Sequence, residues 1–327
     1  MKKTTAIVLA AGKGTRMRSP TPKMLHEVCG TTLLECVIEA VQKAGISKII
    51  VVVGDKKETV KDCVGGMSVK IVEQQKQLGT AHAVQSAQHL LSGATGIVMV
   101  LNGDTPLVKP QTLKKLVDIN AKTNSDVTLL TACLDKPQGY GRISMDARGC
   151  IKGIVEESEA NINELKIKEI NVGIYVFKTT SLFEGLDEIA PHNKKGEFYL
   201  TDIISIFYSK GKKIEGLASE NPIEVLGINT QEELAVANQL KRDEIMRSFM
   251  DKGVTIVNPP NTFIENHVEI GEGTKVYPFT YICKNVDIGQ QCSIGPFVYL
   301  KAGTKIADCT EVKNMVENTG FFSKIEG

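Results

Sequence analysis

The sequence predicts a two-part protein of the α/β class, in which a mixed, mostly parallel sheet with helices on both faces is followed by a short parallel β-helix. Short runs rich in Val and Ile alternate with helical stretches from residue 4 to about residue 230. These runs are apolar along their whole length, as strands buried on both faces of a parallel sheet are. Farther along, from Ile264 to Val312, aliphatic residues recur at an unbroken spacing of six.

The first part alternates strands and helices in the order that an open α/β sheet requires. Five apolar runs are predicted to be strands: TAIVLA (5–10), KIIVVVG (48–54), VKIVEQ (69–74), GIVMVLNGD (96–104) and DVTLLTACL (126–134). Helices are predicted from an i, i+4, i+8 apolar stripe at 33–41 that ends before Gly45, over Thr80 to Leu91, and from Pro110 onward. In such a sheet, ligands bind beyond the carboxyl ends of the strands.

The second part follows a hexapeptide rule. Nine aliphatic residues lie six positions apart: Ile264, Ile270, Val276, Ile282, Ile288, Ile294, Leu300, Ile306 and Val312. This repeat indicates a β-helix, in which each aliphatic residue points inward from one flat side and stacked coils share a core. Three sides of six residues make about 18 residues per coil, so roughly three coils are expected. We therefore expect an α/β domain at 1–230, a linking helix at 231–251 and a short β-helix with a C-terminal tail at 252–327.

Composition and charge exclude several classes of function. The formal net charge of +1 does not steer the molecule toward DNA or an anionic membrane, so no nucleic-acid or membrane partner is expected. No stretch approaches the roughly 20 apolar residues of a membrane span. The apolar run at 6–11 is too short for the core of a secretion signal. The eight cysteines are scattered and form no CxxC pair, so we expect buried free thiols and a cytoplasmic protein.

A glycine-rich loop, AAGKGTRM (10–17), follows the first predicted strand. It lacks the Lys after the second glycine of a P-loop and the third glycine of the dinucleotide fingerprint. Gly12 and Gly14 let backbone N–H groups approach an oxyanion closely. Arg16 can hold phosphate oxygens in bidentate fashion, and Lys23 adds a point charge. The loop alone could be a solvated basic loop, and the motifs that follow it favour phosphate binding.

Further motifs follow the loop in a fixed order. They are LHEVCG (25–30), QLGTAHA (77–83), LNGDTPL (101–107), GYGRI (139–143), GIVEE (153–157), INVGIY (170–175), GEFYLTDII (196–204) and VLGIN (225–229). In this order and spacing they resemble the sugar-nucleotide pyrophosphorylases, and most closely the bacterial bifunctional N-acetylglucosamine-1-phosphate uridyltransferase/glucosamine-1-phosphate acetyltransferase family. The resemblance covers almost the whole chain. It implies a Rossmann-like nucleotidyltransferase domain followed by a left-handed β-helix.

The resemblance implies a uridylyltransferase that makes UDP-N-acetylglucosamine from UTP and N-acetylglucosamine 1-phosphate. A sugar-phosphate oxygen would attack the α-phosphorus of UTP and release pyrophosphate in one in-line step, so positioning and cation clamps supply most of the catalysis. By the resemblance, Arg16 and Lys23 are the catalytic clamps. Asp104 and Asn229 would hold Mg²⁺, which prefers oxygen ligands, although a plain turn role is the alternative for each.

The resemblance also assigns the binding residues. UTP is expected to lie against Leu9, Ala11, Gly12, Gly14, Gln74, Gly79 and Thr80. The Gln74 amide would read the uracil edge, with Gln75 and Gln77 as alternatives for that role. The sugar phosphate is expected to contact Gly141, Glu156, Asn171 and Thr201, with Tyr199 and Asp202 as supports.

Two departures from the family pattern leave alternatives open. Asn102 stands where the family commonly has an aromatic residue beside the sugar. The alternatives are therefore an enzyme for glucose 1-phosphate or dTTP, or, from another class, a non-catalytic nucleotide-sugar sensor. The family's acetyl-transfer histidine comes later in the β-helix than the coils found here, so we expect no acetyltransferase activity. The only histidine of this half is His267 in the first coil, and we expect the β-helix to act as a scaffold. β-Helices of this kind usually trimerise side by side, so a homotrimer is expected.

Overall fold

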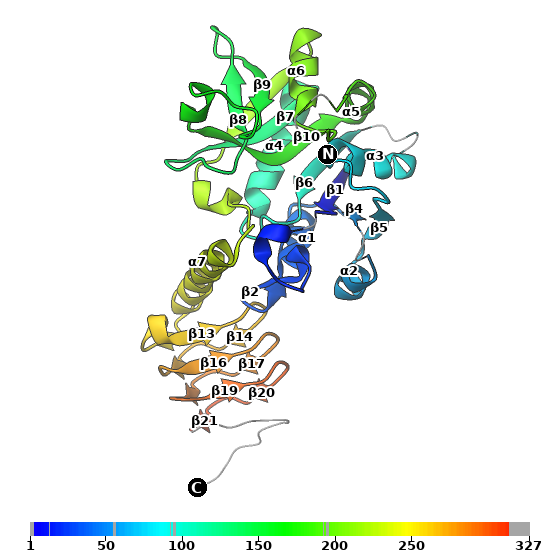
Figure 1. The fold of residues 1–327 in the computed structure, drawn as a ribbon. Coiled ribbons are helices and arrows are strands. Elements are labelled where there is room, and N and C mark those ends of the chain that lie inside the picture. The colour runs from blue at the N-terminus through cyan, green and yellow to red at the C-terminus, as the bar shows by residue number, and fades with distance from the viewer. Residues whose placement is uncertain are drawn as a thin grey trace. The chain divides into compact units, whose positions relative to one another are not determined.

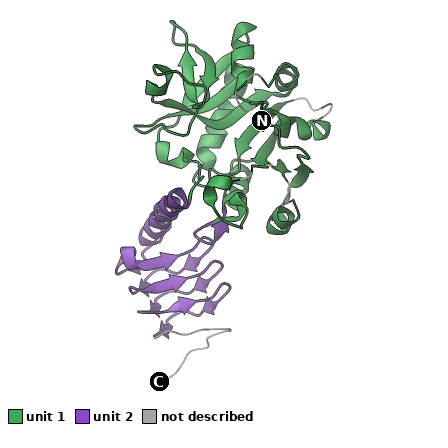
Figure 2. Cartoon of the chain, viewed as in Figure 1, with its two compact units in different colours: residues 1–26, 33–230 green, residues 27–32, 231–327 purple. Residues whose placement is uncertain are grey.

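The computed structural model describes residues 3–12, 14–54, 57–91, 93, 96–191, 193 and 196–313. The chain forms two compact units, which Figure 2 shows in different colours. The first unit comprises residues 1–26 and 33–230, and the second comprises residues 27–32 and 231–327. Lys13 of the glycine-rich loop and residues 314–327, which include the expected C-terminal tail, lie outside the described residues.

The first unit is built on a mixed sheet of nine strands (Figure 1). They are β1 (Thr4–Ala10), β4 (Lys48–Val53), β5 (Lys70–Glu73), β6 (Ile97–Asn102), β7 (Val127–Cys133), β8 (Arg142–Met145), β9 (Ile151–Val155), β10 (Glu169–Lys178) and β11 (Ile214–Ala218). The order is β11-β7-β10-β6-β1-β4-β5, with β8 paired to β10 and β9 to β8. β5, β4, β1 and β6 are parallel, whereas β10 is antiparallel to β6 and β7. The predicted mixed, mostly parallel sheet is confirmed.

Helices cover both faces of this sheet. They are α1 (Leu33–Lys43), α2 (Lys57–Val64), α3 (Thr80–Ser86), α4 (Pro110–Thr123), α5 (Thr179–Leu186) and α6 (Asp202–Ser209). Ala6 and Val8 of β1 belong to the core that includes α1 and α4, and Ile7 and Leu9 belong to the core that includes α3, α5 and α6. This alternation explains why β1 is apolar along its whole length. Within the described part of the chain, no helix combines the length and apolar character needed to cross a membrane.

The carboxyl ends of β1 and β6 lie together in the middle of the sheet. After β1 the chain continues to β4 on one side, and it later returns to β6 on the other side of β1. Such a change of direction leaves a crevice beyond the strand ends, where ligands of α/β proteins bind. The N–H of Gly103 donates to the carbonyl oxygen of Leu9 at 2.9 Å and ties the two strand ends together.

The second unit contains a β-helix whose coils have the predicted length. Its elements are β2 (Glu27–Val28), β3 (Thr31–Thr32), α7 (Gln231–Met250), β12 (Thr255–Ile256), β13 (Thr262–Ile264), β14 (Glu269–Ile270), β15 (Lys275–Val276), β16 (Thr280–Ile282), β17 (Asp287–Ile288), β18 (Ser293–Ile294), β19 (Tyr299–Leu300), β20 (Lys305–Ile306) and β21 (Glu311–Val312). Three parallel sheets form its sides. Thr262 pairs with Thr280 and Glu269 with Asp287, each 18 residues apart. All nine residues of the hexapeptide series are buried.

The hairpin β2–β3 belongs to the second unit, although the sequence pattern places it with the first part of the chain. The N–H of Cys29 donates to Oδ1 of Asn238 in α7 at 2.9 Å. Nδ2 of Asn266 donates to the carbonyl oxygen of Val28 at 2.9 Å. The polar groups of the hairpin are thus satisfied by α7 and by the first coil, which explains its membership of this unit.

All eight cysteines are free thiols, but they are not all buried. Cys133, Cys150 and Cys309 are exposed and Cys36 and Cys63 are half-buried, so the expectation of buried thiols holds only for Cys29, Cys283 and Cys292. Cys133 is the last residue of β7, and Cys150 and Cys309 lie outside helices and strands, so the hydrophobic spacing rules that predict burial did not apply to them.

Candidate active site

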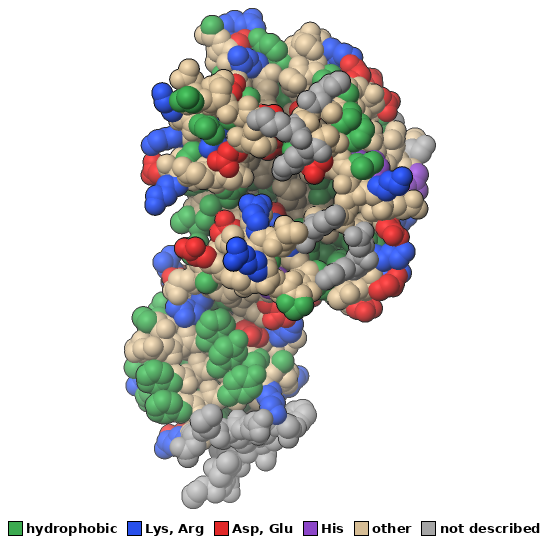
Figure 3. Space-filling view, in the orientation of Figure 1, with side chains coloured by type: hydrophobic (Ala, Val, Ile, Leu, Met, Phe, Trp, Pro, Cys, Tyr) green, Lys and Arg blue, Asp and Glu red, His purple; other side chains and the backbone are tan. Residues whose placement is uncertain are grey.

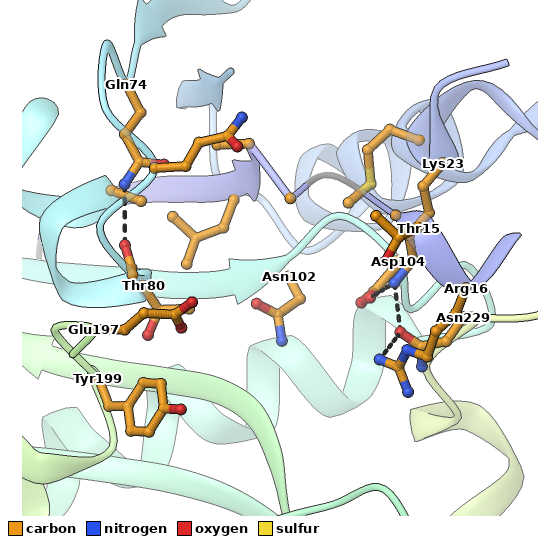
Figure 4. A pocket seen from close by; sticks show the side chains of 18 residues that line it. Thr15, Arg16, Lys23, Gln74, Thr80, Asn102, Asp104, Glu197, Tyr199 and Asn229 are labelled. Carbon is orange, nitrogen blue, oxygen red and sulfur yellow. Dashed lines mark hydrogen bonds and ion pairs between the residues drawn. The ribbon is translucent and has the colours of Figure 1, made fainter. Parts of the chain in front are cut away.

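Two adjoining cavities lie at the carboxyl ends of β1 and β6. The first has a volume of about 520 Å³ (Figure 4), and the second has a volume of about 190 Å³. Both are lined by Leu9, Arg16, Thr80, Asn102, Asp104 and Asn229. The structure brings all fifteen site residues named from the sequence to the walls of these cavities. The two cavities therefore form one candidate site with two compartments.

The expected nucleotide and sugar residues separate between the two compartments. The first compartment is lined by Leu9, Ala11, Gly12, Gly14, Arg16, Lys23, Gln74, Gly79 and Thr80. The second is lined by Gly141, Glu156, Asn171 and Thr201. Asp104 and Asn229 are common to both, so the expected metal ligands lie where the compartments meet.

Lys23 carries the central cation of the first compartment. Its Nζ lies 2.5 Å from Oδ2 of Asp104 and donates to Oδ1 of Asn229 at 2.7 Å (Figure 4). Nη2 of Arg16 donates to the same Asn229 oxygen at 2.8 Å. The side chains of Lys23 and Asp104 are 8% and 16% exposed, so water screens their interaction only weakly. Two cationic groups and the two oxygen-bearing side chains expected to bind a metal thus meet at one point.

The glycine-rich loop has a shape that only glycine permits at one position. Gly14 has a φ of +61°, and a Cβ added there would lie 2.5 Å from Cβ of Lys23. The loop then forms a short 3₁₀ turn, η1 (Thr15–Met17), in which Met17 is buried and Arg16 is exposed. A second turn, η2 (Lys23–Leu25), begins at Lys23 after Pro22. Gly14 therefore lets Lys23 pack directly against the loop.

The two oxygen ligands come from distant segments that hydrogen bonds hold together. The N–H of Ile228 donates to the backbone oxygen of Asp104 at 2.9 Å. The N–H of Gly227 donates to the hydroxyl of Tyr140 at 3.1 Å. These bonds fix the segment that carries Asn229 against the strand end that carries Asp104.

This pair of ligands fits a hard divalent cation. A carboxylate oxygen and an amide oxygen converge on a single ammonium group, and both are ligand types that Mg²⁺ accepts. Among the residues the structure describes, no cluster of three His, Cys, Asp or Glu side chains could hold a metal ion. Mg²⁺ sites often have one or two protein ligands and are completed by substrate oxygens and water. The Asp104–Asn229 pair matches that arrangement.

Gln74 and Gly79 build the far wall of the first compartment. Gln74 is 2% exposed, and its Nε2 donates to the carbonyl oxygen of Gly79 at 3.0 Å. Gly79 has a φ of +116°, and an added Cβ would lie 2.7 Å from the backbone nitrogen of Phe198. Of the two alternative glutamines, Gln77 also lines this compartment, whereas Gln75 lines neither cavity and is exposed.

The polar side chains of the second compartment are paired with one another. The hydroxyl of Thr201 donates to Oε1 of Glu156 at 2.9 Å. The backbone N–H of Asn171 donates to the carbonyl oxygen of Gly141 at 2.9 Å. The Asn171 side-chain oxygen accepts a hydrogen bond from the hydroxyl of Tyr175 at 2.9 Å. These contacts place acceptor and donor groups on the same small cavity, as a sugar with several hydroxyl groups would require.

The structure adds residues to the lining of both compartments, and of these the sequence had named only Gln77, as an alternative, and Tyr199, as a support. The first compartment is also lined by Thr15, Met24, Gln77, Ala83, Glu197 and Tyr199, and the second by Thr105, Gly139, Tyr140, Val172, Gly173, Tyr175, Leu200 and Gly227. Tyr199 lines the wall of the first compartment, whereas Asp202, named with it as a support, lines neither. Tyr140, Glu197 and Tyr175 lie inside the quoted motifs, which was the signal available for finding them.

Two family models match the chain. Residues 6–155 match the MobA-like NTP transferase domain, and residues 267–302 match the bacterial transferase hexapeptide with six repeats. The first match runs from β1 to β9 and includes the glycine-rich loop and Asp104. The second lies within the coils of the β-helix, which is of the left-handed parallel type expected for such repeats.

Several curated proteins named bifunctional protein GlmU are similar to this chain. The protein from Acetivibrio thermocellus is 43% identical over 311 residues, which is 95% of this chain and 67% of that protein. The protein from Pelotomaculum thermopropionicum is 45% identical over 274 residues, which is 84% of this chain and 60% of that protein. The protein from Streptococcus agalactiae serotype V is 45% identical over 273 residues, 84% of this chain and 59% of that protein. The chain thus spans about 60% of the length of most of these relatives.

One solved structure has the same fold with lower sequence identity. It is a putative glucose-1-phosphate thymidylyltransferase from Bacillus anthracis in complex with a sucrose. The match has a TM-score of 0.59 and 22% identity, and it covers 73% of this chain and 96% of that chain.

Proposed function

The chain belongs to the GlmU family, and from this premise we propose that its first unit forms UDP-N-acetylglucosamine and pyrophosphate from UTP and N-acetylglucosamine 1-phosphate. One observation carries the proposal. Lys23, Arg16, Asp104 and Asn229 meet where the two compartments join. A phosphorus atom that reacts between a nucleotide and a sugar phosphate would have to lie at that junction.

The first compartment is proposed to bind UTP. The backbone around Gly12 and Gly14 can donate N–H groups to phosphate oxygens, because no Cβ of either residue stands in the way. Gln74 and Gly79 form the far wall, where an amide and a backbone group can read the edge of uracil. The triphosphate of UTP would thus lie at the glycine-rich loop, and its uracil base would lie at the opposite wall of the compartment.

Asp104 and Asn229 are proposed to hold Mg²⁺ when the substrates are bound. The ion would offset negative charge on the phosphate oxygens that complete its coordination. Lys23 keeps the two protein oxygens close together, and its flexible stem lets the ammonium group reach a phosphate oxygen instead.

The reaction needs no protein nucleophile. A phosphate oxygen of the sugar 1-phosphate forms a bond to the α-phosphorus of UTP while the bond from that phosphorus to the β-phosphate oxygen breaks, and pyrophosphate leaves. The barrier comes from crowding of negative charge, so fixed cations contribute most where that charge increases. Arg16 and Lys23 supply those cations at the junction of the compartments, and the shape of the site aligns the two substrates.

The second compartment is proposed to bind the sugar of N-acetylglucosamine 1-phosphate. Glu156 can accept hydrogen bonds from sugar hydroxyls, and Asn171 can donate to an oxygen of the N-acetyl group. Thr201 fixes the Glu156 carboxylate from the side. A Cβ at Gly141 would lie 2.9 Å from the Ile154 side chain and 3.5 Å from the Glu156 carboxylate, so glycine lets the backbone at this position pack closely beside Glu156.

The second unit is proposed to be a scaffold that forms a homotrimer. Phe279 and Phe297 are 54% and 55% exposed and stack with ring centroids 5.0 Å apart. Figure 3 shows hydrophobic side chains gathered on the visible face of the β-helix. Light scattering should give three times the monomer mass, and a monomer at micromolar concentration would refute this proposal. We expect no thiol release from acetyl-CoA in the presence of glucosamine 1-phosphate.

The proposed function is tested by pyrophosphate release from UTP, with and without Mg²⁺, across three sugar phosphates. Metal-dependent release with N-acetylglucosamine 1-phosphate, and little with glucosamine 1-phosphate or glucose 1-phosphate, is the expected result. Release with glucose 1-phosphate, or with dTTP in place of UTP, would keep the mechanism and change the substrate. Asn102, which lines both compartments, is the residue to which such a change of substrate would be traced. Binding without turnover by folded protein would support a nucleotide-sugar sensor.

A cytoplasmic location is also proposed, because the eight free thiols suit a reducing compartment.

A further inference from the structure

Strand β10 is irregular between Asn171 and Tyr175. Its pairing with β7 changes register between these two residues, and Gly173 between them has a φ of +80°. A bulge of this kind bends a strand and redirects its side chains. Here it brings the hydroxyl of Tyr175 back to the side chain of Asn171, to which it donates a hydrogen bond at 2.9 Å.

The Asn171 amide has a single orientation that satisfies its neighbours. The backbone N–H of Gly173 also points at the amide and lies 3.1 Å from its oxygen. A backbone N–H can only donate, so the amide atom beside it must be oxygen and not nitrogen. Both hydrogen bonds therefore use Oδ1, and among the described residues no hydrogen bond uses Nδ2. The two N–H donors of this group remain for a ligand in the second compartment, which Asn171 lines.

Tyr175 is held as a permanent donor. Its side chain is 3% exposed, and its ring packs 5.6 Å from the ring of Phe177. Burial, and secondly the negative charge of Glu156, raise the pKa of the hydroxyl far above neutral pH. The proton is therefore present at every pH at which the enzyme would work, and the ring has little freedom to turn away from Asn171.

We propose that Tyr175 is a positioning residue for sugar specificity, which holds the Asn171 amide so that its N–H donors face the second compartment. This inference rests on the proposed function and names the group that the compartment selects. Donors in a fixed direction favour an acceptor, such as the carbonyl oxygen of an N-acetylated amino sugar. The ammonium group of a free amino sugar has no acceptor to offer, so it would cover these donors and leave them unpaired.

The first test is the Tyr175→Phe variant, which keeps the ring and removes the hydroxyl. We expect KM for N-acetylglucosamine 1-phosphate to rise roughly fivefold, because one orienting hydrogen bond is lost, while KM for UTP stays unchanged. The preference for this sugar over glucosamine 1-phosphate should fall by the same factor. The matched control is Tyr208→Phe. The hydroxyl that this variant removes donates to Asp146 at 3.0 Å, and Tyr208 lines neither compartment. It should change neither KM.

A second test asks whether the effect passes through Asn171. Affinity for UDP-N-acetylglucosamine is measured by calorimetry for wild type, Tyr175→Phe, Asn171→Ala and the double variant. Tyr175→Phe should weaken binding in the wild-type background and have no effect beside Asn171→Ala, where no amide remains to be oriented. Equal weakening in both backgrounds would overturn the proposal, since the hydroxyl would then act through packing.

A third variant keeps the proposal testable if Tyr175→Phe unfolds. Asn171→Asp keeps the oxygen that accepts from Tyr175 and Gly173 and replaces the two donors by a second oxygen. The preference should shift toward glucosamine 1-phosphate, and an unchanged preference for the N-acetylated sugar would refute the inference. If wild-type protein releases no pyrophosphate with any sugar phosphate, the proposed function fails as well. An active wild type with an unaffected Tyr175→Phe variant rejects the inference alone.

Discussion

Lys23 and Asp104 form an ion pair across 81 positions of sequence, with Nζ and Oδ2 2.5 Å apart. Lys23 lies on the loop after β1, and Asp104 lies directly after β6, which is paired with β1. Adjacent parallel strands deliver their following loops to the same edge of a sheet, so the pair is a consequence of topology. It joins the proposed phosphate clamp to the proposed metal ligand, and each can therefore be tested through the other.

Removal of the Lys23 cation should abolish most of the turnover. In Lys23→Met, kcat for pyrophosphate release is expected to fall at least about 100-fold, because a preorganised charge at the developing negative charge is lost. The matched control is Lys114→Met on the exposed face of α4, which should leave kcat unchanged. A drop of less than fivefold in Lys23→Met would show that Arg16 alone clamps the phosphates.

Removal of the Asp104 charge should also destabilise the first unit. The Lys23 side chain is 8% exposed, and in Asp104→Asn its ammonium group would keep only neutral partners. Breaking a fully buried pair costs about 3–5 kcal/mol, and we expect about 2 kcal/mol here because Asn229 still accepts and Asp104 is partly exposed. Urea unfolding measures this loss. The double variant Lys23→Met/Asp104→Asn should recover part of it, whereas strictly additive losses would contradict the pairing argument.

Loss of the Asn229 oxygen should weaken metal binding more than folding. In Asn229→Ala, the Mg²⁺ concentration for half-maximal pyrophosphate release is expected to rise at least about tenfold, because one of two protein ligands is gone. Direct titration of the metal in the presence of UTP should show the same shift. Asn163→Ala, at an exposed turn, is the control. An unchanged metal requirement would assign Asn229 to the Arg16 and Lys23 contacts alone.

The fold was predictable wherever one rule of periodicity holds over several elements. The buried strands are continuous apolar runs, and the β-helix repeats every six residues. Both patterns can be recognised in the sequence without knowing which segments pack against each other in space. The long antiparallel strand β10 was not predicted, because its register breaks at Gly173 and its sequence alternates only in part. The hairpin 27–32 was misplaced because its partners in α7 and the first coil lie more than 200 positions away.

The site was predictable in composition but not in its internal bonds. The quoted motifs contain every site residue named from the sequence except Leu9, Lys23 and Gln74, each of which lies within three positions of a motif. Motifs cannot show that Lys23 contacts both Asp104 and Asn229, or that Tyr175 orients Asn171, because these contacts depend on how strands end and bend. The place of Tyr199 on the wall of the first compartment was not predictable for the same reason, because its neighbour Phe198 is hydrogen-bonded to Leu78 and Ala81 on either side of Gly79.

Gly79 should be irreplaceable for two separate reasons, strain and a backbone clash. In Gly79→Ala, a φ of +116° and the approach to Phe198 should cost about 2–3 kcal/mol of stability and raise KM for UTP. Gly149→Ala is the matched control, because Gly149 has a φ of +78° with no atom near an added Cβ. It should cost about 1 kcal/mol, by strain alone, and leave KM unchanged. Equal losses in the two variants would show that the clash contributes nothing.

The buried thiol of Cys29 should make the second unit less stable in alkali. Burial raises the pKa of this thiol from 9.0 to about 12, so the unfolded chain loses its proton at a lower pH than the folded one. The stabilisation that comes from keeping this thiol protonated is fully present below about pH 9. It is lost as the pH rises from there toward 12, by at most about 1.4 kcal/mol per pH unit.

The thermal midpoint of Cys29→Ala should therefore fall less steeply between pH 9 and 11 than that of wild type. Cys309→Ala removes an exposed thiol and should keep the wild-type slope. Parallel slopes for wild type and Cys29→Ala would mean that the thiol ionises as readily in the folded protein as in the unfolded chain, so that the hairpin opens to solvent before the unit unfolds.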